Sequence, residues 1–230
     1  MTTASAHRVS AHPRNIALYG GSFDPIHVGH LAVARAAQRR FHLDEIHFVV
    51  AGRPPHKLKH EAAPFPHRYA MAALACSDHA HFVSSLAEAG DDFSGHRVFY
   101  SIDTVRHFRH RLGHPDDCLF FILGVDSFLE IPMWRNYDAL LNACDFIVAS
   151  RPGYRMEPLR LLIPPELLKR SAPPSSHTIH LRKSAVHLLD TVSSHVSSTE
   201  IRRRRHRRQS IHGLVPVRVE EYILRQGLYL

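Results

Sequence analysis

The stretch that decides the fold is "NIALYGGSFDPIHVGHL", residues 15–31. It opens with a run of apolar residues, turns at Gly20 and Gly21, and passes into a helix-like segment that begins near Val28. A buried strand that ends in a glycine turn and leads into a helix is the opening unit of an α/β sheet whose strands run parallel. The region beyond the end of such a strand is where these sheets bind ligands.

The same alternation of strand and helix continues along the chain. Continuous apolar runs predict strands at residues 15–19, 45–50, 81–85, 118–124 and 145–150. Helix-like segments lie between them, at residues 28–40, 66–76, 100–112 and 136–143. Because these strands are apolar throughout, both faces of the sheet are expected to be covered. The sequence therefore predicts a Rossmann-like, doubly wound α/β fold with a parallel sheet and helices on both faces.

The domain organisation follows from where this pattern begins and lapses. Residues 1–14 are polar and predict a flexible N-terminal extension, and residues 15–230 predict a single domain. Prolines in 155–185 exclude a long regular element there and indicate an irregular connection. The segment "VHLLDTV", residues 186–192, predicts a last strand, and residues 196–230 predict a helical segment that closes the chain.

Composition limits the partners and the compartment. The formal net charge of +8 favours polyanions such as nucleotides or nucleic acid. Cys76, Cys118 and Cys144 show no paired metal-type spacing, and their odd number gives no closed disulfide framework. We interpret them as buried packing residues of a cytoplasmic protein. No apolar run resembles a signal peptide or reaches the roughly 18 residues of a membrane span.

His27 and His30 stand where the first loop enters its helix. Residues three apart project from one side of a helical turn, so both imidazoles could face one phosphate and stabilise charge on a pentavalent phosphorus. The missing side chains at Gly20 and Gly21 would let that phosphate approach the backbone, although neither G-x-G-x-x-G nor G-x-x-x-x-G-K-[ST] is present. A metal site and ordinary helix-entry histidines are the alternatives, since 21 of 230 residues are His and no third metal ligand is evident.

These residues also carry a resemblance to a known family. "GGSFDPIHVGHL" resembles the signature of the nucleotidyltransferase superfamily. Five later stretches resemble bacterial nicotinate-nucleotide adenylyltransferase: "RPPHK" (53–57), "FILGVDSFLEIPMW" (121–134), "SRPGY" (150–154), "VSSTEIRRR" (196–204) and "EEYILRQGLY" (220–229). The resemblance implies adenylyl transfer from ATP to nicotinate mononucleotide, giving nicotinate adenine dinucleotide and pyrophosphate for NAD synthesis. It also implies Mg²⁺ that arrives with ATP and requires no protein nucleophile.

The resemblance assigns one set of residues to ATP. It implies that ATP is bound by Gly20, Gly21, Ser22, Phe23, His27, His30, Lys57, Ser197, Ser198, Thr199 and Arg202, of which His27, His30 and Arg202 act in catalysis. From the residues themselves, Lys57 follows a proline turn and is either a phosphate-binding cation or a surface lysine. Ser197 and Glu200 have capping-box spacing, which would fix a helix start and leave further amides for phosphate.

A second set is assigned to the pyridine nucleotide. By resemblance it contains Tyr100, Ser101, Gly124, Asp126, Trp134 and Arg151. Gly124 ends an apolar run and places Asp126 where ribose hydroxyls could donate to it, although Asp126 could also cap a helix. Trp134 resembles the family residue that stacks on the nicotinate ring, and its polar neighbours favour partial exposure over full burial. Ser101 departs from the family, which has threonine there.

Two further alternatives remain open. Nicotinamide mononucleotide and phosphopantetheine are acceptors of related enzymes that share the opening signature. A nonenzymatic protein that binds nucleic acid through the arginine run 202–208 is the alternative of another class. Around a helix these side chains point in every direction, so at most two or three can face one site, and a solvated face is the ordinary interpretation of the others. No aromatic residues interleave with the run to stack on bases. The sequence is compatible with a homo-oligomer and does not fix the oligomeric state.

Overall fold

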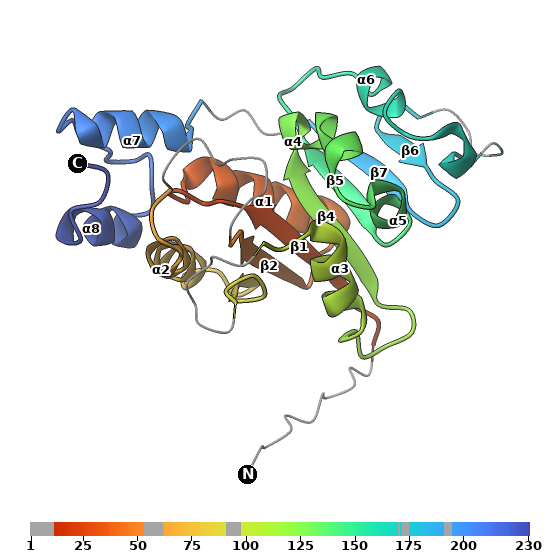
Figure 1. Ribbon diagram of the computed structural model, residues 1–230, viewed down its shortest axis with the longest axis horizontal. Helices are drawn as coiled ribbons and strands as arrows, with labels where there is room; N and C mark the ends of the chain where they lie inside the picture. The colour runs from red at the N-terminus through yellow and green to blue at the C-terminus, as the bar shows by residue number, and fades with distance from the viewer. Residues whose placement is uncertain (1–11, 53–61, 91–97, 170, 172–174, 191–194) are drawn as a thin grey trace, which may run out of the picture.

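The computed structural model describes residues 12–52, 62–90, 98–169, 171, 175–190 and 195–230. Its centre is one seven-stranded sheet in the order β3-β2-β1-β4-β5-β7-β6 (Figure 1). The strands are β1 (Asn15–Gly21), β2 (Glu45–Val50), β3 (Phe82–Ser85), β4 (Cys118–Gly124), β5 (Asp145–Ala149), β6 (Thr178–His180) and β7 (Ala185–Leu189). All neighbours run parallel except β6, which pairs antiparallel with β7.

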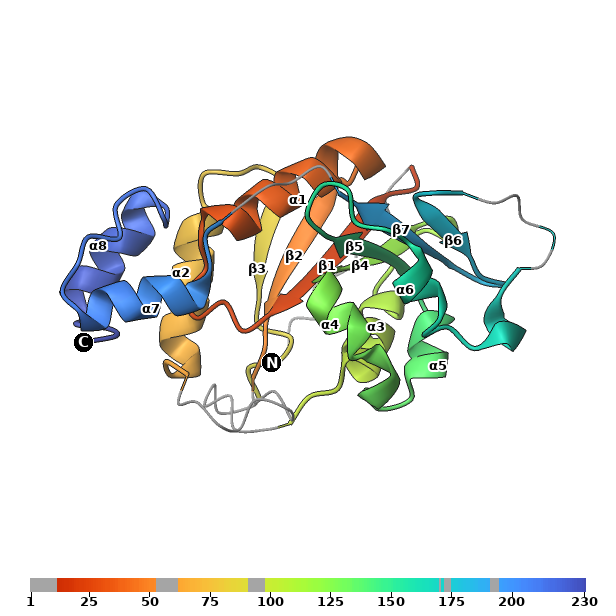
Figure 2. The same cartoon turned by 90° about the horizontal axis from the view of Figure 1, so that it is seen from above.

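Helices cover both faces of this sheet (Figure 2). The α-helices are α1 (Val28–Phe41), α2 (Phe65–Cys76), α3 (Ser101–Arg109), α4 (Val125–Leu129), α5 (Tyr137–Leu141), α6 (Glu157–Arg160), α7 (Ser198–His206) and α8 (Val217–Arg225), with 3₁₀ turns at Ile131–Met133 and Pro165–Leu167. Residues of α1, α2, α7 and α8 contribute to one core, and residues of α3 to α6 contribute to the other. The predicted doubly wound α/β fold is confirmed.

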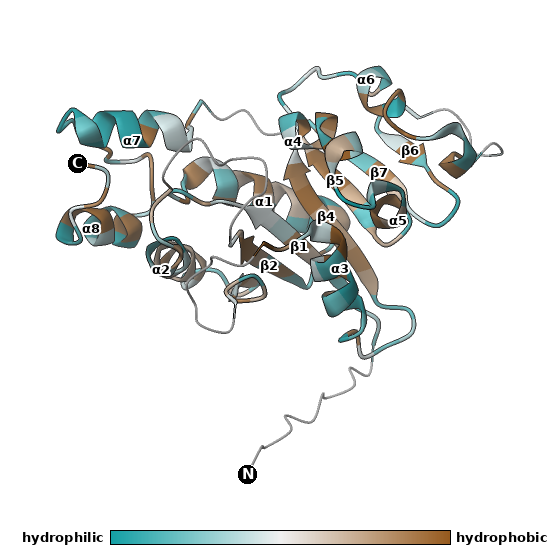
Figure 3. Ribbon diagram, viewed as in Figure 1, coloured by the Kyte–Doolittle hydropathy of each residue, from teal (hydrophilic) through white to brown (hydrophobic). Residues whose placement is uncertain are grey.

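Alternation of side chains along each strand explains the continuous apolar runs. On β1, Ala17 and Tyr19 face the core under α1, whereas Ile16 and Leu18 face the opposite core. Both sets are buried, since each face of the sheet is covered. Figure 3 shows strands that are mostly hydrophobic and helices that carry many hydrophilic residues.

The order of the strands places the ligand crevice. From β1 the chain moves outward through β2 and β3, and from β4 it moves the other way through β5 and β7. The direction therefore reverses between β1 and β4, which pair in parallel with Tyr19 beside Ile122. Gly21 and Gly124 end these two strands at the same edge of the sheet. That edge is the switch point at which open α/β sheets bind ligands.

Two expectations need correction. The connection at 155–185 contains only short elements, as its prolines predict, but it also holds β6, a three-residue strand that makes the sheet mixed rather than wholly parallel. With Ile179 as its one buried residue, β6 is too short to show a pattern in the sequence. Cys76 and Cys144 are buried as expected, whereas Cys118 is exposed at the start of β4.

Arg14 belongs structurally with the sheet. Its backbone N–H donates to Asp117 at 2.8 Å, and its guanidinium lies 3.3 Å from Glu45.

Over the residues that the structure describes, no helix is long and apolar enough to cross a membrane.

Candidate functional site

The loop after β1 is anchored by the side chain of Phe23. This residue is 1% exposed and adopts a φ of 46°, which is uncommon outside glycine. Its ring lies edge-on to Tyr19 and His30, with centroid distances of 5.6 and 5.1 Å. Because the ring belongs to the core, Phe23 can meet a nucleotide only through its backbone.

Gly20 and Gly21 have a packing role that the sequence did not reveal. A Cβ at Gly20 would lie 3.1 Å from the ring of Phe121, and one at Gly21 would lie 3.1 Å from the ring of Phe23. Both distances are tighter than ordinary van der Waals contact. The missing side chains therefore admit two aromatic rings, in addition to leaving backbone open at the crevice.

His27 and His30 lie side by side at the start of α1. Their rings stack with centroids 3.7 Å apart, and Nδ1 of His30 accepts the backbone N–H of His27 at 3.2 Å. A neutral His30 therefore carries its ring proton on Nε2, where it can donate to a ligand. The first amide of the helix is not free for an anion, however, because Val28 donates its N–H to Leu214 at 3.1 Å.

Burial keeps both imidazoles neutral. It lowers the pKa of His27 to about 4. It also lowers the pKa of His30 well below the ordinary value, and the neighbouring His27 adds to this shift. Nδ1 of His27 is buried and has no hydrogen-bond partner among the described residues. At neutral pH the two side chains are thus uncharged donors, one of which has an unused polar atom.

The side chain of Arg68, in α2, binds the backbone of the loops around this site. It is 4% exposed, and its guanidinium donates to four backbone carbonyl oxygens at 2.6 to 3.0 Å. The acceptors follow β1 and β2 or precede α2, and they are Ser22, Ala51, Gly52 and Ala63. One side chain therefore holds three segments at the carboxyl edge of the sheet.

The N-terminus of α7 docks on the loop that carries the histidines. Arg202 donates to the backbone oxygen of Asp24 at 2.6 Å and lies 3.8 Å from its carboxylate. Ser198 donates its hydroxyl to the backbone oxygen of Pro25 at 2.9 Å, and Thr199 accepts a bond from Arg202 at 3.4 Å. The two predicted ATP-binding segments, more than 170 residues apart in the chain, thus form one surface.

The helix cap and the arginine run differ in part from expectation. Ser197 accepts the N–H of Glu200 at 3.2 Å, which confirms the serine half of the predicted capping box. The Glu200 carboxylate binds Arg203 and Arg204 at 2.6 and 2.9 Å, which lowers its pKa. Arg205 is only 9% exposed, because it lies one turn beyond the buried Ile201 on the same side of α7, so the run is not solvated throughout.

The predicted pyridine-nucleotide residues come from the other half of the sheet. Tyr100 precedes α3, and the guanidinium of Arg135 lies 4.5 Å above its ring. Trp134 is half-buried, as its neighbours predict, and meets the ring of Phe121 edge-on at 6.3 Å. Tyr100 and Trp134 both pack, partly buried, against the core on this face of the sheet.

The remaining candidates lie near the ends of β4 and β5. Gly124 precedes α4 and has open space where a Cβ would stand. Asp126 is exposed in the first turn of that helix, which Gly124 rather than Asp126 caps. Ser101 opens α3, and Arg151 is exposed just after β5. Lys57, with the whole stretch "RPPHK", lies outside the described residues.

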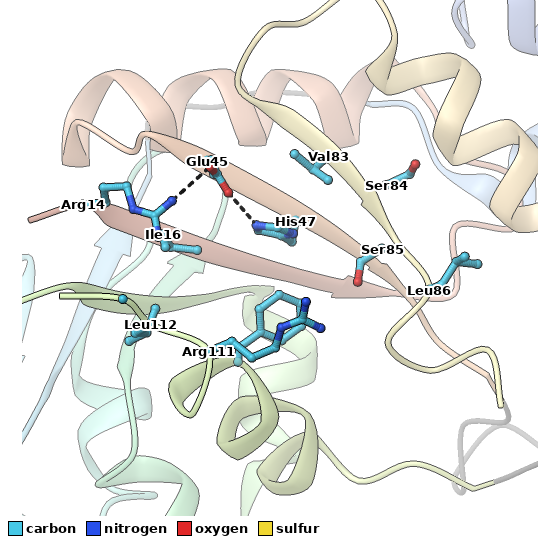
Figure 4. A pocket seen from close by; sticks show the side chains of 12 residues that line it. Arg14, Ile16, Glu45, His47, Val83, Ser84, Ser85, Leu86, Arg111 and Leu112 are labelled. Atoms are coloured by element: carbon cyan, nitrogen blue, oxygen red, sulfur yellow. Dashed lines mark hydrogen bonds and ion pairs between the residues drawn. The ribbon is translucent and has the colours of Figure 1, made fainter. Parts of the chain in front are cut away.

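A hollow of about 380 Å³ lies elsewhere, between α3 and the face of β1, β2 and β3 (Figure 4). Two of its polar side chains bind the carboxylate of a third: Arg14 lies 3.3 Å from Glu45, and His47 lies 3.0 Å from the same carboxylate. None of the predicted site residues lines it. We therefore assign the site to the carboxyl edge of the sheet and not to this hollow.

Three residues of the site were missed by sequence reasoning. Asp24 lies inside the opening motif, where its pairing with proline gave a turn signal only. Arg68 lies within an ordinary helical segment, and no local pattern marks it as buried. Tyr229 is the penultimate residue, and its hydroxyl donates to Asp24 at 2.7 Å across the domain. Contacts between residues so far apart in the chain leave no local pattern in a single sequence.

Comparison with known proteins agrees with this geometry. A family model described as cytidylyltransferase-like matches residues 18–204. Two relatives carry the name "Probable nicotinate-nucleotide adenylyltransferase". The Moorella thermoacetica protein is 39% identical over 94% of this chain and 92% of its own length, and the Solibacter usitatus protein is 41% identical over 82% and 85%. The Plasmodium falciparum nicotinic acid mononucleotide adenylyltransferase complexed with NaAD superposes with a TM-score of 0.68 at 21% identity, over 94% and 97% of the two chains, which shows the shared fold.

The lowered pKa of His27 predicts a dependence of stability on pH. The unfolded chain takes up the His27 proton near pH 6.5, whereas the folded protein resists it down to about pH 4. Stability is therefore lost as the pH falls through this window. Compared with His27→Gln, the wild-type protein should lose roughly 2 kcal/mol more of its free energy of unfolding between about pH 7 and about pH 4.5. Urea unfolding of both proteins at several pH values measures this, and parallel curves would contradict it.

Proposed function

The chain belongs to the nicotinate-nucleotide adenylyltransferase family, and we infer that it transfers the adenylyl group of ATP to nicotinate mononucleotide. In this reaction a phosphate oxygen of nicotinate mononucleotide attacks the α-phosphorus of ATP, and the bond from that phosphorus to the bridging oxygen breaks. The products are nicotinate adenine dinucleotide and pyrophosphate, in a step of NAD synthesis. Direct displacement needs no nucleophile from the protein.

One observation carries the proposal. The loop with His27 and the helix start with Arg202 are joined through Asp24 at the carboxyl edge of β1. The segments that carry the neutral imidazoles and the guanidinium are therefore in direct contact at this edge. Such groups suit a transition state in which charge spreads over phosphate oxygens, because fixed donors need no rearrangement when that charge develops.

We propose that the triphosphate occupies the side of the crevice formed by the β1 loop and α7. His27 and His30 meet the α-phosphate, and Arg202 with the α7 amides binds the phosphates that leave as pyrophosphate. Gly20, Gly21, Ser22 and Phe23 offer backbone to ATP, and Ser197, Ser198 and Thr199 offer the helix start. Lys57 keeps its proposed role as a further phosphate-binding cation on the ground of resemblance alone.

The acceptor occupies the other side of the switch point, beyond β4. Trp134 stacks on the pyridine ring, because it is half-buried and its ring is held by Phe121. Tyr100 and Ser101 lie at the start of α3, beside Arg135. Asp126 accepts ribose hydroxyls, with Gly124 leaving room for the sugar and Arg151 available to the acceptor's negative charge.

Mg²⁺ enters with ATP as part of the substrate and neutralises charge on its phosphates. Among the described residues, no cluster of at least three His, Cys, Asp or Glu side chains could hold a metal ion. We also propose a cytoplasmic location, which the unpaired cysteines favour.

The direct test is turnover with two acceptors. The purified protein is incubated with ATP, Mg²⁺ and either nicotinate or nicotinamide mononucleotide, while pyrophosphate and dinucleotide are measured. We expect product mainly from nicotinate mononucleotide. A preference for the nicotinamide form would keep the chemistry and change the acceptor. If neither gives product, phosphopantetheine is tried next, followed by nucleic-acid binding, which weakens steeply with salt.

The histidine pair should act on the chemical step. His27→Ala and His30→Ala each remove a donor that meets charge developed in the transition state, so we expect kcat to fall by about 100-fold while both KM values change little. His206→Ala is the matched control, because this exposed histidine lies at the far end of α7. An unchanged kcat in both site variants would remove the pair from the mechanism.

Trp134 should act on acceptor binding. Trp134→Ala removes the stacking surface, so the KM for nicotinate mononucleotide should rise about tenfold, and the KM for ATP should rise far less. Met133→Ala controls for the substitution itself, since Met133 is the neighbour of Trp134 and its own side chain is 63% exposed. Equal changes in the two KM values would reject the stacking role.

A further inference from the structure

The loop after β1, which carries the histidines, contains a buried carboxylate that no step of the proposed reaction uses. Asp24 is 5% exposed. One carboxylate oxygen accepts the hydroxyl of Tyr229 at 2.7 Å and the backbone N–H of Ala63 at 3.2 Å, and the other lies 3.8 Å from Arg202. A charge buried to this extent is stable only when it is paired and hydrogen-bonded, and each of these contacts meets that need.

Tyr229 links this carboxylate to the end of the chain. Burial and the adjacent Asp24 raise the pKa of its phenol, so the hydroxyl stays protonated and acts as the donor. The connection between α7 and α8 touches the loop as well, because the backbone oxygen of Leu214 accepts the N–H of Val28, the first amide of α1. The C-terminal residues thus support the loop on both sides of His27.

Arg202 is the group that Asp24 orients. The guanidinium is only half-buried, and a flexible side chain in that position has several rotamers open to it. Its bond to the backbone oxygen of Asp24 and its proximity to the carboxylate select one of them. These contacts leave further N–H groups of the guanidinium available for phosphate oxygens.

We propose that Asp24 and Tyr229 are positioning residues for adenylyl transfer: the C-terminal tyrosine fixes the Asp24 carboxylate, which in turn holds Arg202 against the loop that carries His27. This inference rests on the proposed function and extends it to residues outside both substrate sites. An arginine already oriented when ATP arrives costs less rotamer entropy on binding and is in place when charge develops. The last residues of the chain therefore belong to the catalytic apparatus.

The test compares two tyrosines of the C-terminal segment. Tyr229→Phe removes the hydroxyl that binds Asp24, whereas Tyr222→Phe removes one that lies 2.9 Å from Nδ1 of His67, away from the loop. We expect Tyr229→Phe to lower kcat/KM for ATP about tenfold, with the KM for nicotinate mononucleotide unchanged within about twofold. Tyr222→Phe should keep both parameters within about twofold of wild type, and thermal unfolding confirms that each variant is folded.

A double-mutant cycle separates positioning from general support of the fold. In a background of Arg202→Ala, Tyr229→Phe should have almost no further effect on kcat/KM, because the group that it orients is gone. An effect of the same size in both backgrounds would overturn the proposal. Asp24→Asn gives a second test, since it retains an oxygen for Tyr229 and Ala63 but loses the charge opposite Arg202. It should lower kcat/KM for ATP, but less than Arg202→Ala does, because Arg202 keeps its bond to the backbone oxygen of residue 24.

The outcomes also separate this inference from the proposed function. Absence of dinucleotide formation by the wild-type protein would refute the function, and the positioning role with it. Normal wild-type turnover with full activity of Tyr229→Phe would refute only the positioning role.

Discussion

One buried guanidinium holds the carboxyl edge of the sheet together. Parallel strands leave irregular loops at that edge, and those loops have carbonyl oxygens that no ladder satisfies. Arg68 donates to such oxygens after β1, after β2 and before α2, so three independent segments share one point of attachment. Burial lowers the pKa of Arg68, and the charges of Asp24 and Glu88 oppose that shift. The charge is retained, because arginine does not deprotonate in proteins.

On this base the candidate site is assembled from segments that are far apart in the chain. Phe23 anchors the loop after β1 in the core, and Asp24 beside it receives contacts from α7 and from the chain terminus. The residues that meet at Asp24 are separated by 178 and 205 positions. Arg202 consequently has its orientation only when the whole domain is folded, whereas the stacked pair of His27 and His30 is set by the first turn of α1.

The agreement between pattern and structure was best where local spacing decides the outcome. The strand β1 and the helix start at Val28 lie where their sequence predicts, because side-chain periodicity is a property of neighbouring residues. The turn predicted at Gly20 and Gly21 was wrong, since both glycines continue β1 and pair with Val49 and Val50 of β2. The short strand β6 escaped because three residues carry too little pattern. Cys118 was assigned the wrong exposure, since packing between elements determines burial at such a position.

The sequence by itself determined the fold class, the family and the two segments that bear the histidines and Arg202, because each of these depends on motifs and periodicity within a short stretch. Only the tertiary structure decided which charges meet. Asp24 finds Tyr229 and Arg202, and Arg68 finds its carbonyl oxygens, through distances that the chain closes by folding. The physical reason is that burial makes an unpaired charge costly, so the folded protein supplies partners from wherever the topology brings them close.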